Sequence, residues 1–158
     1  MEIQSGCSRP RTAIPPPLPF ALAIAVGWWL DRRVVPLTLG DSHVALWFGG
    51  IAVAMGLCLF VWALWTLHKH HTTVNPFKGS TSLCTGGPFG LSRNPIYLAD
   101  WVILLGAAFL MGSAWPLVFS PALWYVIRYR VIAYEEEYLT ARFGSAYTAY
   151  RESVRRWL

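Results

Sequence analysis

The chain has 158 residues, of which 55% are hydrophobic and 13% are charged. Soluble domains of average composition carry about 25% charged residues, and a small domain needs a charged surface because its surface-to-volume ratio is high. The composition therefore argues against an ordinary soluble domain, and nine Trp, seven Tyr and eight Phe exclude a disordered chain. The net charge is +5, but the basic residues lie between apolar runs and do not cluster, so we expect a lipid bilayer as partner and no nucleic acid.

Two apolar stretches in the first half of the chain predict two membrane spans. The first, at about 14–33, begins with a Pro-rich turn and ends at Asp31-Arg32-Arg33. A cleaved signal peptide is the alternative, but the bulky Trp28-Trp29-Leu30 does not resemble a small-residue cleavage site. The second, 44–67, has 24 consecutive uncharged positions. At 1.5 Å per residue, that length crosses a hydrocarbon core of about 30 Å.

The second half of the chain predicts a helical hairpin. Residues 96–127 carry one charge, Asp100, and are too long for one span, while the breaker Gly112-Ser113-Ala114-Trp115-Pro116 divides them. We expect spans at about 95–112 and 115–134, the second kinked at Pro121. Residues 135–158 repeat apolar side chains at intervals of three and four, which predicts an interfacial amphipathic helix interrupted near Gly144.

The expected fold class is therefore an all-α polytopic membrane protein. It has about four transmembrane helices plus the C-terminal interfacial helix, in a single domain, 1–158. With four spans, eleven of the thirteen basic residues share one side and only Arg32 and Arg33 face the other. The positive-inside rule then predicts a multi-pass protein with both termini in the cytoplasm.

Several polar features have both a structural and a functional interpretation. The cluster His68-Lys69-His70-His71 has no partner at ligand spacing, so we favour a membrane-interface cap and predict no metal site. The Gly- and hydroxyl-rich segment 79–90 is equally consistent with an ordinary loop and with a binding loop. Three cysteines without paired spacing indicate no disulfide framework.

Two acidic features remain open in the same way. Asp100 lies one turn inside an apolar helix, on nearly the same face as Arg93 and Tyr97. It indicates either a functional cavity or a structural pair with Arg93 or another polar group. Glu135-Glu136-Glu137 is either a solvated helix end balanced by Arg128 and Arg130, or a carboxylate site for a cationic ligand.

Two motifs together identify a family resemblance. The run TGGPFGLSRNPIYLA is followed, after the hairpin, by EE-x-x-L-x-x-x-FG-x-x-Y-x-x-Y-x-x-x-V-x-R-W-L. Over about residues 72–158 the chain resembles the isoprenylcysteine carboxyl methyltransferases, whose superfamily includes phospholipid methyltransferases. The resemblance implies an integral membrane methyltransferase that binds S-adenosyl-L-methionine on the cytosolic side.

The resemblance also implies roles for individual residues. Within a cofactor loop at 72–95, it implies cofactor contacts by Thr81, Ser82, Leu83, Cys84, Phe89, Asn94, Pro95 and Tyr97. Glu135 and Glu136 match the family's acidic pair, linked there to acceptor binding and catalysis, and Arg130 is the nearest counterpart of an arginine that precedes that pair. This chain has Asn94 where the family usually has His and Ala99 where it has Gly, and Asp100 adds a charge.

The expected function is S-adenosylmethionine-dependent methyl transfer to a lipophilic small-molecule or lipid-linked acceptor. The sequence does not identify the acceptor molecule or its reacting atom. Two alternatives are a nicotinamide-dependent membrane reductase-like protein, suggested by Arg93-Asn94-Pro95, and a non-catalytic membrane scaffold that retains the fold.

Overall fold

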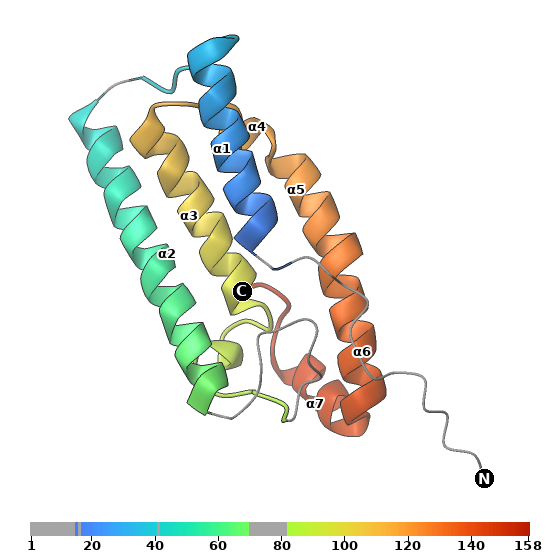
Figure 1. The fold of residues 1–158 in the computed structure, drawn as a ribbon. Helices are drawn as coiled ribbons and strands as arrows, with labels where there is room; N and C mark the ends of the chain where they lie inside the picture. The colour runs from blue at the N-terminus through green and yellow to red at the C-terminus, as the bar shows by residue number, and fades with distance from the viewer. Residues whose placement is uncertain (1–14, 16, 41, 70–81) are drawn as a thin grey trace.

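A computed structural model describes residues 15, 17–40, 42–69 and 82–158, and over these residues the chain is helical. Three helices run side by side, and a fourth helical column lies against them (Figure 1). The three are α1 (Pro17–Arg33), α2 (His43–Lys69) and α3 (Pro95–Met111). The column comprises α4 (Trp115–Val118), α5 (Ser120–Val126), the π-helical η2 (Ile127–Ile132) and α6 (Ala133–Phe143). A 3-10 turn, η1 (Gly87–Gly90), precedes α3, and α7 (Ser145–Ser153) follows the column.

The helix boundaries agree with the sequence at the hairpin and differ from it after residue 134. Met111 is followed by Gly112 at φ 62°, a left-handed conformation that glycine adopts without strain, and α4 starts at Trp115. The boundary expected between 134 and 135 is wrong. Nothing breaks the helix there, and α6 continues the fourth column to Phe143, where Gly144 at φ 54° ends it. Residues 135–158 therefore form the end of one helix, then α7, then an extended tail.

The expected kink at Pro121 is also misplaced. The column breaks two residues earlier, at Phe119, and Pro121 lies in the first turn of α5. Proline is tolerated there because its missing N–H would have no intrahelical acceptor in any case.

Small residues let α2 and α3 pack with their backbones in contact. A Cβ atom added to Gly106 would lie 2.8 Å from the carbonyl oxygen of Gly49, and one added to Gly56 would lie 3.0 Å from the carbonyl oxygen of Ala99. Close approach of this kind is typical of membrane helices, where dispersion contacts drive association. It fixes α3, which carries much of the site described below, against α2.

At the end of the bundle where α1 ends and α2 begins, hydrogen bonds join the end of α1 and the α1–α2 connection to the turn between α3 and α4. The Trp115 indole donates to the Val35 carbonyl at 2.8 Å, and the Ala114 amide donates to the Leu37 carbonyl at 2.7 Å. The Ser113 hydroxyl donates to the Asp31 carboxylate at 3.0 Å. These bonds fix the register of α1 against α3 and α4.

α2 is both long and apolar enough to cross a bilayer, and it is the one helix of the described residues that meets both conditions. Its most apolar 18-residue window has a mean hydropathy of 2.3, and 17% of that window is buried. A core helix of a soluble protein would be mostly buried, whereas α2 exposes large side chains such as Trp47, Ile51 and Met55. α3 is apolar but shorter, at 17 residues.

Candidate active site

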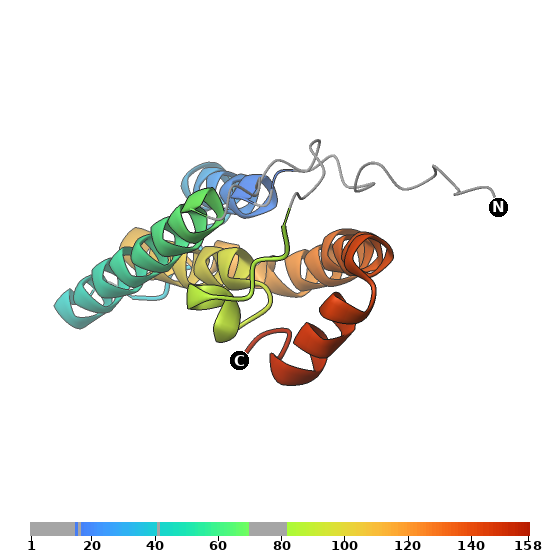
Figure 2. The same ribbon diagram turned by 90° about the horizontal axis from the view of Figure 1, so that it is seen from below.

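The two motif regions meet at the end of the bundle where α2 ends and α3 begins. Seen from that end, α7 and the C-terminal tail turn back from α6 towards η1 and the start of α3 (Figure 2). Residues 82–97 and 135–157, which lie far apart in sequence, therefore form one surface region. The contacts that join them are side-chain and tail hydrogen bonds, described next.

The tail residue Arg156 is held by the segment before α3. Its carbonyl oxygen accepts hydrogen bonds from the Asn94 side-chain amide at 2.9 Å and from the Ser92 hydroxyl at 3.2 Å. The Arg93 amide donates to the Arg155 carbonyl at 3.0 Å. Asn94 occupies the N-cap position of α3, but its side chain makes no capping hydrogen bond and instead fixes the tail.

Glu136 is the centre of an ion-pair network. Arg156 donates to it through Nε (2.9 Å to Oε1) and Nη2 (2.7 Å to Oε2), which is a bidentate pair. Arg93 Nη1 lies 3.1 Å from Oε1, an ion pair without hydrogen-bond alignment. The interpretation in which Arg128 and Arg130 balance this acidic run is wrong for Glu136. Its charge is compensated by the guanidinium groups of Arg93, from the first motif, and Arg156, from the tail.

Glu135 has a different environment from its neighbour. Its carboxylate accepts a hydrogen bond from the Tyr97 hydroxyl at 3.3 Å and forms no ion pair with the described residues. Burial raises the pKa of Glu135 above its ordinary value; the Tyr97 hydrogen bond opposes this increase, and the charge of Glu136 adds to it. The two adjacent glutamates thus differ in charge compensation, because Glu136 is paired with two arginines and Glu135 with none of the described residues.

The loop residues that the resemblance implies as cofactor contacts are partly or fully buried where the structure describes them. Thr81 lies outside the described residues. Ser82 and Leu83 are partly buried, and Pro95 is the buried first residue of α3. Cys84 is buried in an apolar cluster of α2 and α3 residues, against which Phe89 also packs. Burial raises the pKa of the Cys84 thiol, which favours its neutral form.

Arg130 is not brought to the acidic pair by any contact. Its side chain is exposed, and it makes no hydrogen bond or ion pair within the described ranges. Arg128, two residues earlier in η2, lies over the rings of Trp124 and Tyr129, at 5.3 and 5.5 Å from their centroids. Arginines at this position of the chain therefore contact aromatic rings or solvent, and the guanidinium groups at the acidic pair are Arg93 and Arg156.

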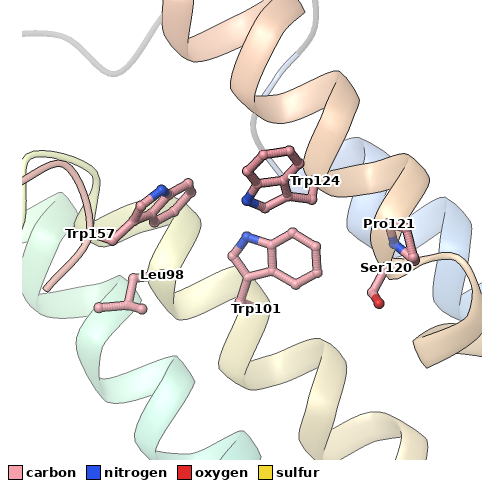
Figure 3. Close-up of a pocket in the computed structure, with 6 residues that line it drawn as sticks. All are labelled: Leu98, Trp101, Ser120, Pro121, Trp124 and Trp157. Carbon is pink, nitrogen blue, oxygen red and sulfur yellow. The ribbon is translucent and has the colours of Figure 1, made fainter.

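A groove of about 480 Å³ lies between α3 and α5. Trp101 and Trp124 face each other across it, and Trp157 of the tail lies at one end (Figure 3). Its other lining residues are Leu98, Ser120 and Pro121. The lining is largely apolar, which suits a hydrocarbon chain.

The histidine cluster is described only in part. Lys69 lies with its ammonium 5.4 Å from the centroid of the Trp65 ring, an arrangement typical of an interfacial residue. His70 and His71 lie outside the described residues, and no group of three or more His, Cys, Asp or Glu side chains gathers among the residues that are described.

A sequence model of the family described as phospholipid methyltransferase matches residues 44–146, about two thirds of the chain. The chain belongs to the phospholipid methyltransferase family. It is also 36% identical, over 73 residues, to the protein-S-isoprenylcysteine O-methyltransferase of Schizosaccharomyces pombe. That match covers 46% of this chain and 30% of the relative, so the chain spans less than a third of the relative's length. No solved structure matches the chain.

Two site residues of this phospholipid methyltransferase family member were not predicted to act there. The sequence suggests Arg93 only as one of the possible partners of Asp100, and it suggests Arg156 only as a cytoplasmic charge. Both belong to the quoted motifs, RNPIY and V-x-R-W-L, which is the signal that identifies them. Arg156 lies beyond the family match, so the site of this family member is completed by its tail.

Proposed function

We propose that this protein is an integral membrane methyltransferase that uses S-adenosyl-L-methionine to methylate a lipophilic or membrane-embedded acceptor. The observation that carries the proposal is the joining of the two motif regions. Tyr97 contacts Glu135, Arg93 contacts Glu136, and Asn94 contacts the backbone of Arg156. These contacts, in a member of a methyltransferase family, bring the expected cofactor segment beside the expected catalytic carboxylates.

The residues at this site fit a zwitterionic cofactor. Arg93 Nε is buried and has no hydrogen-bond acceptor in the described part of the chain, so it suits a carboxylate. Glu135 has no cationic partner there, so its carboxylate is left to act on the acceptor rather than to hold the cofactor. Tyr97 and Phe89 offer aromatic surface for the adenine or the sulfonium. The side chains of Cys84 and Asn94 are engaged elsewhere, and we expect these two residues to shape the loop.

For methyl transfer, the protein has to align the acceptor with the methyl group, exclude water and, for some acceptors, accept one proton. When bound, S-adenosyl-L-methionine supplies an activated methyl group. A carboxylate acceptor needs no base, whereas an amine or thiol acceptor must lose a proton, which Glu135 accepts. Burial raises the pKa of Glu135, so its carboxylate is a stronger base than that of an exposed glutamate. Glu136 is fixed by two arginines and acts as a positioning residue for Arg93 and the tail.

The acceptor site and topology form part of the same proposal. The groove lined by Trp101 and Trp124 opens between α3 and α5, where a hydrocarbon chain in the bilayer would reach it. We infer four spans, formed by α1, α2, α3 and the part of the fourth column from α4 to η2, with the acidic residues of α6 beyond the bilayer. Both termini are then cytoplasmic, on the side that carries most of the basic residues.

The direct test is calorimetric binding of S-adenosylmethionine and S-adenosylhomocysteine by the detergent-purified protein. Methyl-labelled cofactor and total membrane lipid then reveal the acceptor. Glu135→Gln should retain cofactor binding and lose turnover on an amine or thiol acceptor, while the exposed Glu137→Gln serves as the matched control. Folded protein that binds neither cofactor form, or that binds a nicotinamide cofactor in preference, contradicts the proposal.

A further inference from the structure

We infer that Asp100 binds the positively charged group of a ligand, either the sulfonium of the cofactor or an ammonium carried by the acceptor. This inference rests on the proposed function and names a residue that the family resemblance does not provide. Its basis is a buried carboxylate that the described chain leaves without a partner.

Asp100 lies in the second turn of α3 and is 4% exposed. Its Oδ2 atom is buried and has no hydrogen-bond donor in the described part of the chain. Two other carboxylates of the described residues have such partners. Asp31 accepts hydrogen bonds from the Leu37 amide and the Ser113 hydroxyl, and Glu136 is held by two arginines.

Among the described residues, no cation pairs with Asp100. The helical spacing places it on the same side of α3 as Tyr97, one turn earlier, and Leu104, one turn later. Both of these residues belong to the apolar cluster that α3 forms with α1, α5 and η2. Arg93, one of the partners that the sequence suggests for Asp100, lies 3.1 Å from Glu136 and forms an ion pair with it.

A buried charge in a membrane protein is expensive unless it is paired, and such residues mark ligand sites. Asp100 follows the Tyr97–Glu135 pair along α3, on the side away from the ion-pair network. A ligand reaching from that network past Glu135 would present its charge to Asp100. The sulfonium of S-adenosylmethionine and a protonated amine share the chemistry that this carboxylate recognises, which is a compact positive charge.

Comparing S-adenosylmethionine with S-adenosylhomocysteine tests whether Asp100 binds the cofactor sulfonium or an acceptor ammonium. The sulfur of S-adenosylmethionine is positively charged, and that of S-adenosylhomocysteine is neutral. Calorimetric titration of wild-type protein, Asp100→Asn and the control Glu137→Gln measures both affinities. If Asp100 pairs with the sulfonium, Asp100→Asn loses about 10- to 100-fold in affinity for S-adenosylmethionine and keeps its affinity for S-adenosylhomocysteine.

A second titration uses dodecylamine and dodecanoate on the protein saturated with S-adenosylhomocysteine. If Asp100 binds an acceptor ammonium, Asp100→Asn loses affinity for dodecylamine alone. Wild-type affinity of Asp100→Asn for both cofactor forms and for dodecylamine overturns the inference.

Two controls keep the result interpretable. Thermal unfolding confirms that each variant is folded, and Asp100→Ser supplies a second uncharged variant if Asn disturbs the packing. Wild-type protein that binds neither cofactor form refutes the proposed function and the sulfonium source together, and the dodecylamine titration, repeated on the cofactor-free protein, then decides the role of Asp100.

Discussion

The contact between α2 and α3 allows a quantitative prediction about Gly106→Ala. A Cβ atom at this position would lie 2.8 Å from the Gly49 carbonyl oxygen, from the Val53 amide nitrogen and from a Val53 methyl group. Ordinary contacts of a Cβ begin at 3.4 Å, so the helices must separate locally by about 0.6 Å, the difference between the two distances. Two of the three atoms belong to the backbone of α2 and cannot rotate away. Overpacking of this kind costs about 1–3 kcal/mol.

The matched control is Gly50→Ala in α2, where an added Cβ meets no atom within 4 Å. Both substitutions gain about 1 kcal/mol of helix propensity, so their difference isolates the steric cost. We expect the Tm of Gly106→Ala in detergent, followed by tryptophan fluorescence, to lie roughly 2–12 °C below that of Gly50→Ala. Because α3 carries Tyr97 and Asp100, cofactor affinity should fall as well. Equal Tm values for the two variants would refute the close packing of α2 against α3.

Three further predictions concern the site. The raised pKa of Glu135 means that its contribution to the free energy of unfolding decreases as pH rises from about 4.5 through that pKa, whereas methyl transfer to an amine or thiol increases. Rate profiles of the wild-type protein measure the second dependence. Glu135→Gln should abolish the pH dependence of stability in denaturation profiles, and an unchanged denaturation profile would exclude this role. Arg156→Gln breaks the bidentate pair with Glu136, and we expect a loss of about 1–2 kcal/mol by denaturation, below the range for a fully buried pair because Arg156 is partly exposed. Tyr150→Phe removes the 2.6 Å hydrogen bond to the Phe89 carbonyl and should cost about 1 kcal/mol in the same measurement; wild-type stability would contradict that bond.

The sequence predicted helix boundaries correctly where Pro or Gly interrupts the helix. Pro95 begins α3, and the Gly112 region ends it and starts the hairpin. At 134/135 the change from apolar to charged residues predicts a helix boundary, but α6 runs through this point. Helix geometry depends on backbone conformation, and a change in polarity without Gly or Pro does not interrupt it. The fourth column therefore continues to Gly144.

The sequence by itself indicated that the chain is exposed to lipid, where its apolar helices lie and which family it resembles. Composition, the length of apolar runs and the order of motifs do not depend on tertiary contacts. The partners of the charged residues were decided only by the tertiary structure. Glu136 is paired with Arg93 and Arg156, each at least 20 residues away in the sequence. Arg128 and Arg130, which one of the two interpretations of the sequence placed opposite the acidic run, do not pair with it. Helical spacing reports which face a side chain occupies, but the packing of α3, α6 and the tail determines which opposite charge it reaches. That packing leaves Asp100 without a partner among the described residues.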